Sequence, residues 1–383
     1  MKKTLKAAVA LSVLAAPAYA ANLENPLYMP KQGSVYSKTS AGVMYKIADD
    51  TEAMIKKNHD GATEFPIWRL HEELGYGILD NLEAYAKLGY THDGDIDRKG
   101  MHLGRAGLKY RALEMSGYVW DLYADAQLGG ISEMSGSYDV DGFTYDNYSN
   151  GRWGFHVGTQ FGKQFEKISV AAFAEVLRTF GNDNNSIEVK AIDASKLGAG
   201  ILDRDTLSML GFENEISVDL KSATEVNAGL KAFYQMNDKW SFGASFTYKH
   251  HADNGVDGLA SGLGAISQAS ATKAAIGSVM EANPSLSLND AMVYVQANPA
   301  VVAAAATTLS DKQQQVKAGL LGVVEDMNDG FDEYVIGLSA AYQMTDTTQV
   351  AVYGEYTLDT AHEQSQNGTD VKAEMGVRLN VQF

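Results

Sequence analysis

The C-terminal residues alternate strictly between apolar and polar side chains. In the segment VKAEMGVRLNVQF, from Val371 to Phe383, every odd-numbered position is apolar and every even-numbered position is polar or Gly. A period of two residues places the two sets of side chains on opposite faces of a β-strand. The pattern therefore predicts a strand with one apolar and one polar face that ends at the last residue.

The same alternation recurs upstream, so the sequence predicts about twelve strands in total. They span residues 41–47, 68–78, 82–90, 106–110, 118–128, 153–161, 168–176, 226–236, 240–248, 333–344, 349–359 and 371–383. Short turns and longer links connect them in alternation. The longer links span residues 49–64, 92–100, 129–151, 181–224, 252–332 and 360–370. An even number of strands with short turns at one end and long loops at the other is typical of a transmembrane barrel.

Because lipid offers no hydrogen-bond partner to a bare strand edge, only a closed barrel satisfies every backbone group inside a membrane. The fold class we predict is all-β: a transmembrane antiparallel up-and-down β-barrel with a helical extracellular insertion. A soluble β-sandwich also alternates, but its turns show no such difference in length. Residues 186–193 and 213–221 alternate as well. They form either a hairpin outside the membrane, which we favour, or two further strands that would make fourteen.

One residue conflicts with this pattern. Glu72 falls on the apolar face of its predicted strand. Either it lies above the hydrocarbon, or a β-bulge shifts the register at that point.

A strand that ends at the last residue on an aromatic side chain, here Phe383, resembles the closing strand of Gram-negative outer-membrane β-barrels. The resemblance to these porin-like proteins covers nearly the whole predicted mature chain, is one of architecture and points to no single family. It implies an outer-membrane location and contact with outer-membrane lipid and lipopolysaccharide. It also implies insertion by the outer-membrane assembly machinery, with Phe383 as the terminal assembly signal.

The first twenty residues predict export. Lys2, Lys3 and Lys6 precede an apolar run over residues 7–16, and Ala18-Tyr19-Ala20 is a small-x-small cleavage site. This order is that of a secretory signal peptide. We therefore predict a signal peptide over residues 1–20 and a barrel over residues 21–383.

Composition narrows the function classes. The chain has no Cys, which excludes disulfides, thiol nucleophiles and Cys-ligated metals. Its net charge of −17 makes it a poor nucleic-acid binder. We expect no cofactor and no metal.

The polar faces of the predicted strands identify the side chains that would line the lumen, where basic residues outnumber acidic ones. The candidates are Lys38, Arg69, Glu73, Glu83, Lys87, Arg105, Lys109, Arg111, Asp121, Asp125, Glu175, Lys231, Glu355, Lys372, Glu374 and Arg378. These charges could line a narrow water path, or they could form ion pairs that close the lumen. Inward rings such as Tyr123 and Phe173 among inward glycines predict a tightly curled sheet.

The link over residues 252–332 is Ala-rich and helical in pattern. Residues 271–282 contain strong helix formers, and Ser287 with Asp290 resembles an N-terminal cap for a helix over residues 288–297. Ser310 could cap another helix. The insertion could cap the barrel mouth, enter the lumen as a plug, or be a flexible surface loop.

Catalytic and metal-binding motifs are weak. His71 precedes Glu72, and the pair His250-His251 is followed two residues later by Asp253, but adjacent residues of a strand point to opposite faces. The run from Asp93 begins like a calcium loop but lacks its turn Gly and its final Glu. We therefore expect that the protein is not an enzyme.

The sequence favours an outer-membrane porin-like channel for passive passage of small polar solutes or ions. A non-conducting structural or surface-interaction barrel that uses the helical loop is the alternative, and an outer-membrane hydrolase is a weaker one.

Overall fold

The structure is a computed structural model of the chain. It describes residues 22–48, 67–93, 98–129, 134–135, 137–140, 143–146, 152–189, 191–193, 201–252, 256–307, 330–359 and 371–383.

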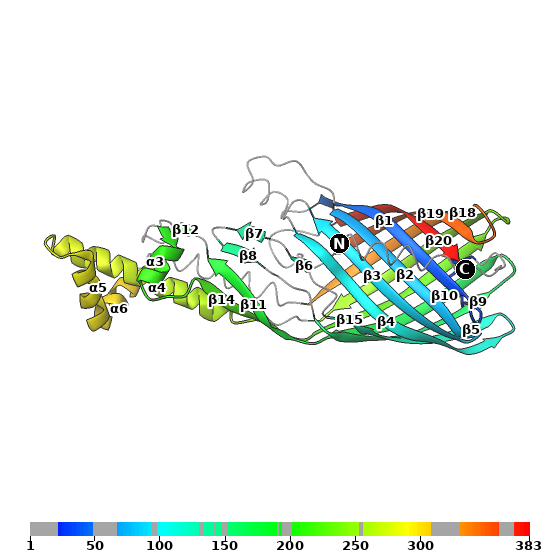
Figure 1. Ribbon diagram of the computed structural model, residues 1–383, viewed down its shortest axis with the longest axis horizontal. Coiled ribbons are helices and arrows are strands. Elements are labelled where there is room, and N and C mark those ends of the chain that lie inside the picture. Colours follow the sequence, from blue (N-terminus) through cyan, green and yellow to red (C-terminus); the bar gives the residue numbers. More distant parts are fainter. Residues whose placement is uncertain are drawn as a thin grey trace.

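Twelve antiparallel strands form a closed barrel (Figure 1). They are β1 (Val35–Ala48), β2 (Ile67–Leu79), β3 (Leu82–Asp93), β4 (Arg98–Met115), β5 (Tyr118–Gln127), β9 (Gly154–Gln164), β10 (Ile168–Thr179), β15 (Ala223–Gln235), β16 (Trp240–His251), β18 (Phe331–Gln343), β19 (Thr348–Asp359) and β20 (Val371–Gln382). The pairing runs from β1 through every neighbour to β20 and back to β1. The strand number and the order predicted from alternation are confirmed.

The first and last strands close the circle. Their register runs from Tyr36 opposite Gln382 to Lys46 opposite Lys372. Beyond it, the Phe383 amide donates to the Val35 carbonyl at 2.8 Å. No barrel strand edge is left unpaired along this seam, as a membrane wall requires.

The outer face of the barrel is apolar and exposed. Leu338 and Met375 are 64% and 62% exposed, and Leu70, Leu230 and Val377 are similarly uncovered. A soluble protein does not present a continuous belt of such side chains to water. Aromatic rings stand near both ends of the strands on the same face, for example Trp240 beside Tyr342 with ring centroids 5.0 Å apart. This arrangement suits a barrel in a bilayer, where such rings lie at the two interfaces.

Glu72 lies on the outer face without a register shift. The β1–β2 pairing is continuous, and Thr39 lies opposite Glu72. Ser37 donates to Glu72 Oε1 at 2.6 Å, and the Thr39 hydroxyl donates to Oε2. Glu72 is four residues from Trp68 and four from Tyr76, so it lies near the middle of the apolar band rather than beyond it. Neither of the two explanations offered by the sequence, a bulge or a position above the hydrocarbon, is correct. The Glu72 carboxylate is accommodated on the outer face because two hydroxyl groups on β1 donate hydrogen bonds to it.

Residues 182–189 and 215–220 form β11 (Asn182–Val189) and β14 (Glu215–Leu220), which lie outside the barrel. They pair in a separate sheet with β7 (Ser137–Val140), β8 (Phe143–Asp146) and β17 (Val256–Asp257). The short strands β6 (Met134–Ser135), β12 (Ala191–Asp193) and β13 (Ile201–Asp203) complete the described strands. The favoured hairpin, rather than a fourteen-stranded barrel, is confirmed.

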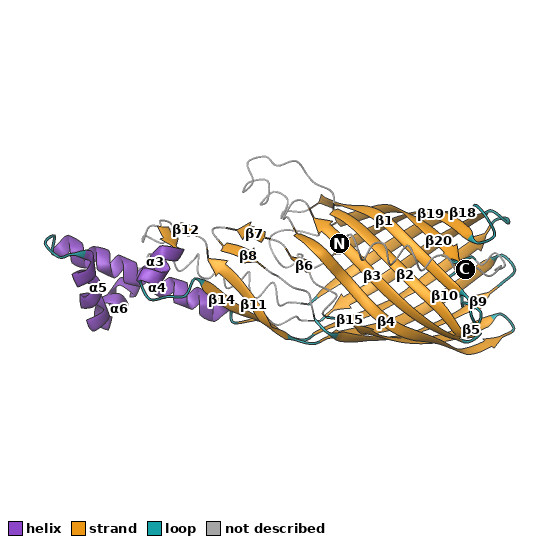
Figure 2. Ribbon diagram, viewed as in Figure 1, coloured by secondary structure: helices purple, strands orange, loops and turns teal. Residues whose placement is uncertain are grey.

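A small helical head lies beyond this sheet, at the end of the molecule far from the barrel (Figures 1 and 2). It contains α3 (Arg204–Met209), α4 (Leu259–Ala282), α5 (Leu288–Ala297) and α6 (Pro299–Thr307). Its core joins Leu202, Leu207 and Leu210 to Ile266, Ala275, Ile276 and Val295. Two loops therefore build the head, whereas the sequence pattern located helices only in the second.

Local signals explain where the helices begin. Ser287 caps α5 and accepts a hydrogen bond from the Asp290 amide at 3.2 Å, as predicted. Pro299 begins α6, a position that needs no amide donor. The predicted cap at Ser310 lies outside the described residues. None of the described helices is long and apolar enough to cross a bilayer.

Candidate functional site

The N-terminal segment, residues 22–34, crosses the barrel lumen at its short-turn end. Asn22 contacts both Gln235 on β15 and Gln349 on β19, through side-chain hydrogen bonds of 2.6 and 3.1 Å. At its other end, the amide of Gln32 donates to Asp80 in the β2–β3 turn at 3.0 Å, and the Gly33 amide donates to the Gly77 carbonyl. The segment therefore reaches from one wall to the opposite wall before it continues into β1.

Its backbone carbonyls are bound by lumen side chains. Gln160 donates to the Pro26 carbonyl at 2.8 Å, Arg111 to the Leu27 carbonyl at 2.6 Å, and Lys109 to the Tyr28 carbonyl at 3.0 Å. The side chain of Leu27 is buried against Val119 and Ala171. Burial of one Leu contributes about 1.5–3 kcal/mol. The segment is thus packed and hydrogen-bonded inside the barrel.

Glu24 forms an ion pair with the barrel wall. Its two carboxylate oxygens lie 3.0 and 3.1 Å from Nη1 of Arg378, and Asn380 donates to Oε1 at 2.8 Å. Burial acts to raise the pKa of Glu24, but Arg378 and the Asn380 amide outweigh burial and lower that pKa below its ordinary value. The carboxylate is therefore ionised where it meets Arg378.

A polar chamber of about 420 Å³ lies in the lumen beside this segment. Leu23, Glu24, Asn25, Pro26 and Tyr28 form part of its lining. The predicted lumen residues in its lining are Lys38, Glu73, Glu83, Lys87, Lys109, Asp121, Glu175, Lys231, Glu355 and Arg378.

Strand register pairs many of these charges. Lys38 and Lys87 lie directly opposite Glu73 on the neighbouring strands and approach its two oxygens to 3.2 and 3.4 Å. Lys109 lies opposite Glu83 at 2.9 Å, a pair in which Glu83 is buried. Because directly opposed positions on one face of an antiparallel sheet are close neighbours, each pair follows from the register alone.

The predicted residues outside the chamber lining also form ion pairs. Arg69 pairs with Glu374 at 2.9 Å and Arg105 with Asp125 at 3.9 Å, and Arg111 pairs with Asp121 of the lining at 2.8 Å. Asp125 also accepts from Tyr85, and it contacts His156 Nδ1 at 2.7 Å. The side chain of Lys372 lies outside the described part of the chain. The structure thus places the predicted charges together on the inner face, most of them in pairs.

Two inner glycines allow aromatic rings to lie flat against the wall. A Cβ at Gly158 would overlap the ring of Tyr123, and one at Gly229 would overlap the ring of Phe173. The predicted arrangement of inward rings over inward glycines is present.

The N-terminal segment is the part of the site that sequence reasoning missed. Residues 22–34 show no alternation and contain Pro26 and Pro30, so they predict neither a strand nor a helix. The sequence contains one weak signal for its position. This stretch lies between the predicted cleavage site and the first strand, so it must lie near the short-turn end of the barrel.

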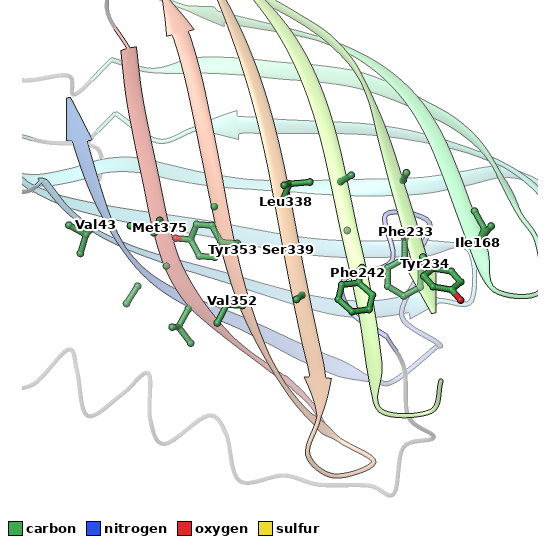
Figure 3. Close-up of a pocket in the computed structure, with 18 residues that line it drawn as sticks. Val43, Ile168, Phe233, Tyr234, Phe242, Leu338, Ser339, Val352, Tyr353 and Met375 are labelled. Carbon is green, nitrogen blue, oxygen red and sulfur yellow. The ribbon is translucent and has the colours of Figure 1, made fainter. Parts of the chain in front are cut away.

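An apolar hollow lies on the barrel wall over β15, β16, β18, β19 and β20 and reaches β10 and β1 (Figure 3). Small outward-facing residues Ala232, Ala244 and Gly354 leave room there between Phe242 and Leu338. In a membrane wall such a surface meets lipid chains, so an apolar hollow there is no sign of a solute site. The chamber, not this hollow, is the candidate site.

The histidines singled out by the sequence lie in two places. His71 contacts His102 within the lumen, with Nε2 atoms 2.9 Å apart. His250 contacts Asp332 at 2.8 Å, and His251 lies 3.5 Å from Glu225, at the long-loop end of the wall. Within the described residues, no cluster of three or more His, Asp or Glu has the geometry of a metal site.

Comparisons with known proteins identify no family for this chain. A scan against protein-family models finds no match, and a search of curated proteins finds none. Among solved structures, an outer membrane channel from Pseudomonas putida F1 is 12% identical, with 95% of this chain and 99% of that chain covered and a TM-score of 0.47. The deltaS2 mutant of the TodX monoaromatic hydrocarbon channel is 9% identical, covers 94% and 91%, and has a TM-score of 0.45.

The translocator domain of the autotransporter NalP from Neisseria meningitidis is 10% identical, covers 93% and 91%, and has a TM-score of 0.44. At such identities no residue role transfers from these proteins. The barrel described above is established by its own strand pairing.

Proposed function

We propose that this protein is an outer-membrane channel for passive passage of small polar solutes or ions, closed at its periplasmic end by residues 22–34. The observation that carries the proposal is a polar chamber inside an apolar wall. Its lining is rich in Lys and Glu, and the N-terminal segment forms one side of it. Short turns face the periplasm and long loops face outward in this assignment.

The chamber suits small hydrated solutes. A volume of about 420 Å³ corresponds to roughly 14 water molecules at about 30 Å³ each. Entry of an apolar solute would strip water from the surrounding charges without replacing their hydrogen bonds, which is unfavourable. Passage of a polar solute requires the N-terminal segment to move, because its backbone spans the lumen.

The proposed partners follow from this role. They are outer-membrane lipid, lipopolysaccharide, small solutes and the assembly machinery, which would recognise the final strand and Phe383. No catalytic step is part of the proposal. Substitution of His71, His250 and His251 by Ala should leave conductance unchanged.

Recording from purified protein in planar bilayers tests the proposal. Discrete conductance steps with brief openings are expected for the full chain. Absence of any step, both in the full chain and in variants with a released N-terminal segment, would refute a channel function.

A second function is favoured by the helical head, whose position suits contact with a partner outside the cell (Figure 2). Val293 and Tyr294 on α5 are 59% and 50% exposed. In this alternative, deletion of residues 252–332 abolishes binding to a partner surface but leaves the barrel folded. Unchanged binding after the deletion would eliminate it.

A further inference from the structure

Two histidines lie against each other in the lumen, toward the long-loop end of the wall. His71 on β2 and His102 on β4 have their Nε2 atoms 2.9 Å apart, with ring centroids 4.9 Å apart and ring planes inclined at 67°. Both side chains are half-buried, and neither lines the chamber. The pair is therefore separate from the candidate site described above.

A β-bulge turns His102 toward the lumen. In the β3–β4 register, Gly89 lies opposite Leu103 and the next pair joins Tyr90 to Met101, so His102 is an extra residue on β4. Strict alternation from the inward Leu103 would place His102 on the lipid side. A bulge re-aims a single side chain in this way, and bulges are common beside functional sites.

Gly89 on β3 makes room for the two rings. It lies opposite His71 on the neighbouring strand. A Cβ at Gly89 would lie 2.6 Å from Cε1 of His102 and 2.8 Å from Cδ2 of His71. Any side chain there would push the two rings away from their present contact, so a bulge and a glycine together create the pair.

The Thr91 hydroxyl on β3 orients His102. Thr91 is buried, and its Oγ1 lies 2.8 Å from His102 Nδ1. With its ring proton on Nδ1, His102 donates to Thr91 and presents the Nε2 lone pair to His71. Histidines that bind metals are held in the same way, by a hydrogen bond from the other ring nitrogen.

The positive side chains that act on the pair are compensated. Arg69, Arg105 and Arg378 each interact electrostatically with one or both rings. Each of these arginines lies within 3.9 Å of a carboxylate oxygen. The partner of Arg69 is Glu374, whose negative charge also acts on His71. A cation between the rings therefore meets arginines whose charge is already balanced.

The spacing of the two nitrogens selects a coordination geometry. An ion bound to both Nε2 atoms at about 2.0–2.1 Å would hold them at an angle of about 90°. That is the angle between neighbouring ligands of a square-planar or tetragonal ion, which is the geometry of Cu²⁺ and Ni²⁺. A tetrahedral ion such as Zn²⁺ would need the two nitrogens about 3.3–3.4 Å apart.

We infer that His71 and His102 form a binding site for Cu²⁺, with both Nε2 atoms as ligands and water in the remaining positions. Among divalent first-row ions, Cu²⁺ binds nitrogen ligands most tightly. For binding, His71 carries its ring proton on Nδ1 instead of Nε2, and no proton is gained or lost overall. The inference goes beyond the proposed function, because binding at this pair requires no passage of solute.

Calorimetric titration tests the site, with Cu²⁺ and Zn²⁺ as probes and the full chain in detergent, purified without a histidine tag. The variants are His71→Gln, His102→Gln and Thr91→Val. His92→Gln is the matched control, because His92 is a histidine of β3 on the outer face, opposite Trp68. Should one histidine variant fail to fold, the other decides the comparison.

We expect one Cu²⁺ per chain in the tightest binding step, and weaker binding of Zn²⁺. His71→Gln and His102→Gln should each weaken Cu²⁺ binding by about tenfold or more, and Thr91→Val by roughly tenfold. His92→Gln should match the unmodified chain. Equal affinity for Cu²⁺ in the unmodified chain and both histidine variants would overturn the site, and tighter binding of Zn²⁺ than of Cu²⁺ would overturn its geometry.

Electron paramagnetic resonance of the Cu²⁺-loaded chain counts the bound imidazoles directly. Two coupled imidazoles are expected in the unmodified chain and in His92→Gln, and one in His71→Gln or His102→Gln. A spectrum of the unmodified chain with fewer than two imidazoles would overturn the inference whatever the affinity. Neither measurement depends on ion flow, so a non-conducting barrel would leave this site standing.

Discussion

Removal of the Glu24 charge should release the N-terminal segment and open the channel. In Glu24→Gln, the neutral amide keeps the size of the side chain but cannot neutralise Arg378. Both carboxylate oxygens now contact Arg378 Nη1, and Oε1 also accepts from Asn380. The amide NH₂ of Gln would have to face one of these donors.

The size of the effect follows from burial. Removal of one partner of a fully buried ion pair costs about 3–5 kcal/mol. The Glu24 side chain is 6% exposed, but that of Arg378 is 28% exposed, so solvent reduces the loss to about 2–3 kcal/mol. At about 1.4 kcal/mol per factor of ten, the ratio of open to closed channels should rise roughly 30- to 150-fold.

Single-channel recording at neutral pH measures this ratio directly. Glu166→Gln is the matched control, because Glu166 is an exposed carboxylate in the β9–β10 turn at the same end of the barrel. The double variant Glu24→Gln/Arg378→Gln should open no more than the more open single variant, since the two side chains act as one pair. Equal open probability in Glu24→Gln, Glu166→Gln and the unmodified chain would refute the reasoning.

Three further predictions concern acid, the lipid-facing carboxylate and the head. The pKa of Glu24 is lowered below its ordinary value of 4.5, so the Glu24 carboxylate stabilises the closed state fully above pH 4.5, and this stabilisation is lost as pH falls through the lowered pKa. Open probability should therefore rise on acidification, and Glu24→Gln should abolish that rise. Ser37→Ala with Thr39→Val removes both donors to Glu72 and should destabilise the folded barrel by about 1–3 kcal/mol in denaturant titrations in lipid. Addition of Glu72→Leu should restore stability, and no restoration would show that the two hydroxyls do not act through Glu72. Leu207→Ala should destabilise the head by about 2–5 kcal/mol and expose it to limited proteolysis while the barrel stays resistant; cleavage of the barrel at the same protease concentration would contradict separate cores.

The barrel is predictable from sequence because each wall strand must separate lipid from lumen. Apolar and polar side chains therefore alternate with a period of two residues in segments such as Val371–Gln382 and Trp240–His251. The interior charges were predictable as a set for the same reason. Their pairing was not, because the Lys109–Glu83 and Lys87–Glu73 contacts depend on cross-strand register.

The N-terminal segment escaped prediction for a different physical reason. Its bonds to Gln160, Arg111 and Lys109 use backbone carbonyls, which every residue has, so no side-chain pattern records them. The helical head was predicted only in part because its core combines Leu207 with Val295, which come from two separate loops. Glu72 looked like an error in the pattern because its two hydroxyl donors lie on another strand.

The central claim is that the barrel is a channel closed by its own N-terminal segment. The most direct test compares the conductance of the unmodified chain with that of a variant that lacks residues 22–33, each first shown to be folded by its resistance to unfolding in detergent at room temperature. The account predicts rare openings in the first and a steady, larger conductance in the second. A folded truncated barrel that conducts no more than the intact chain would contradict it.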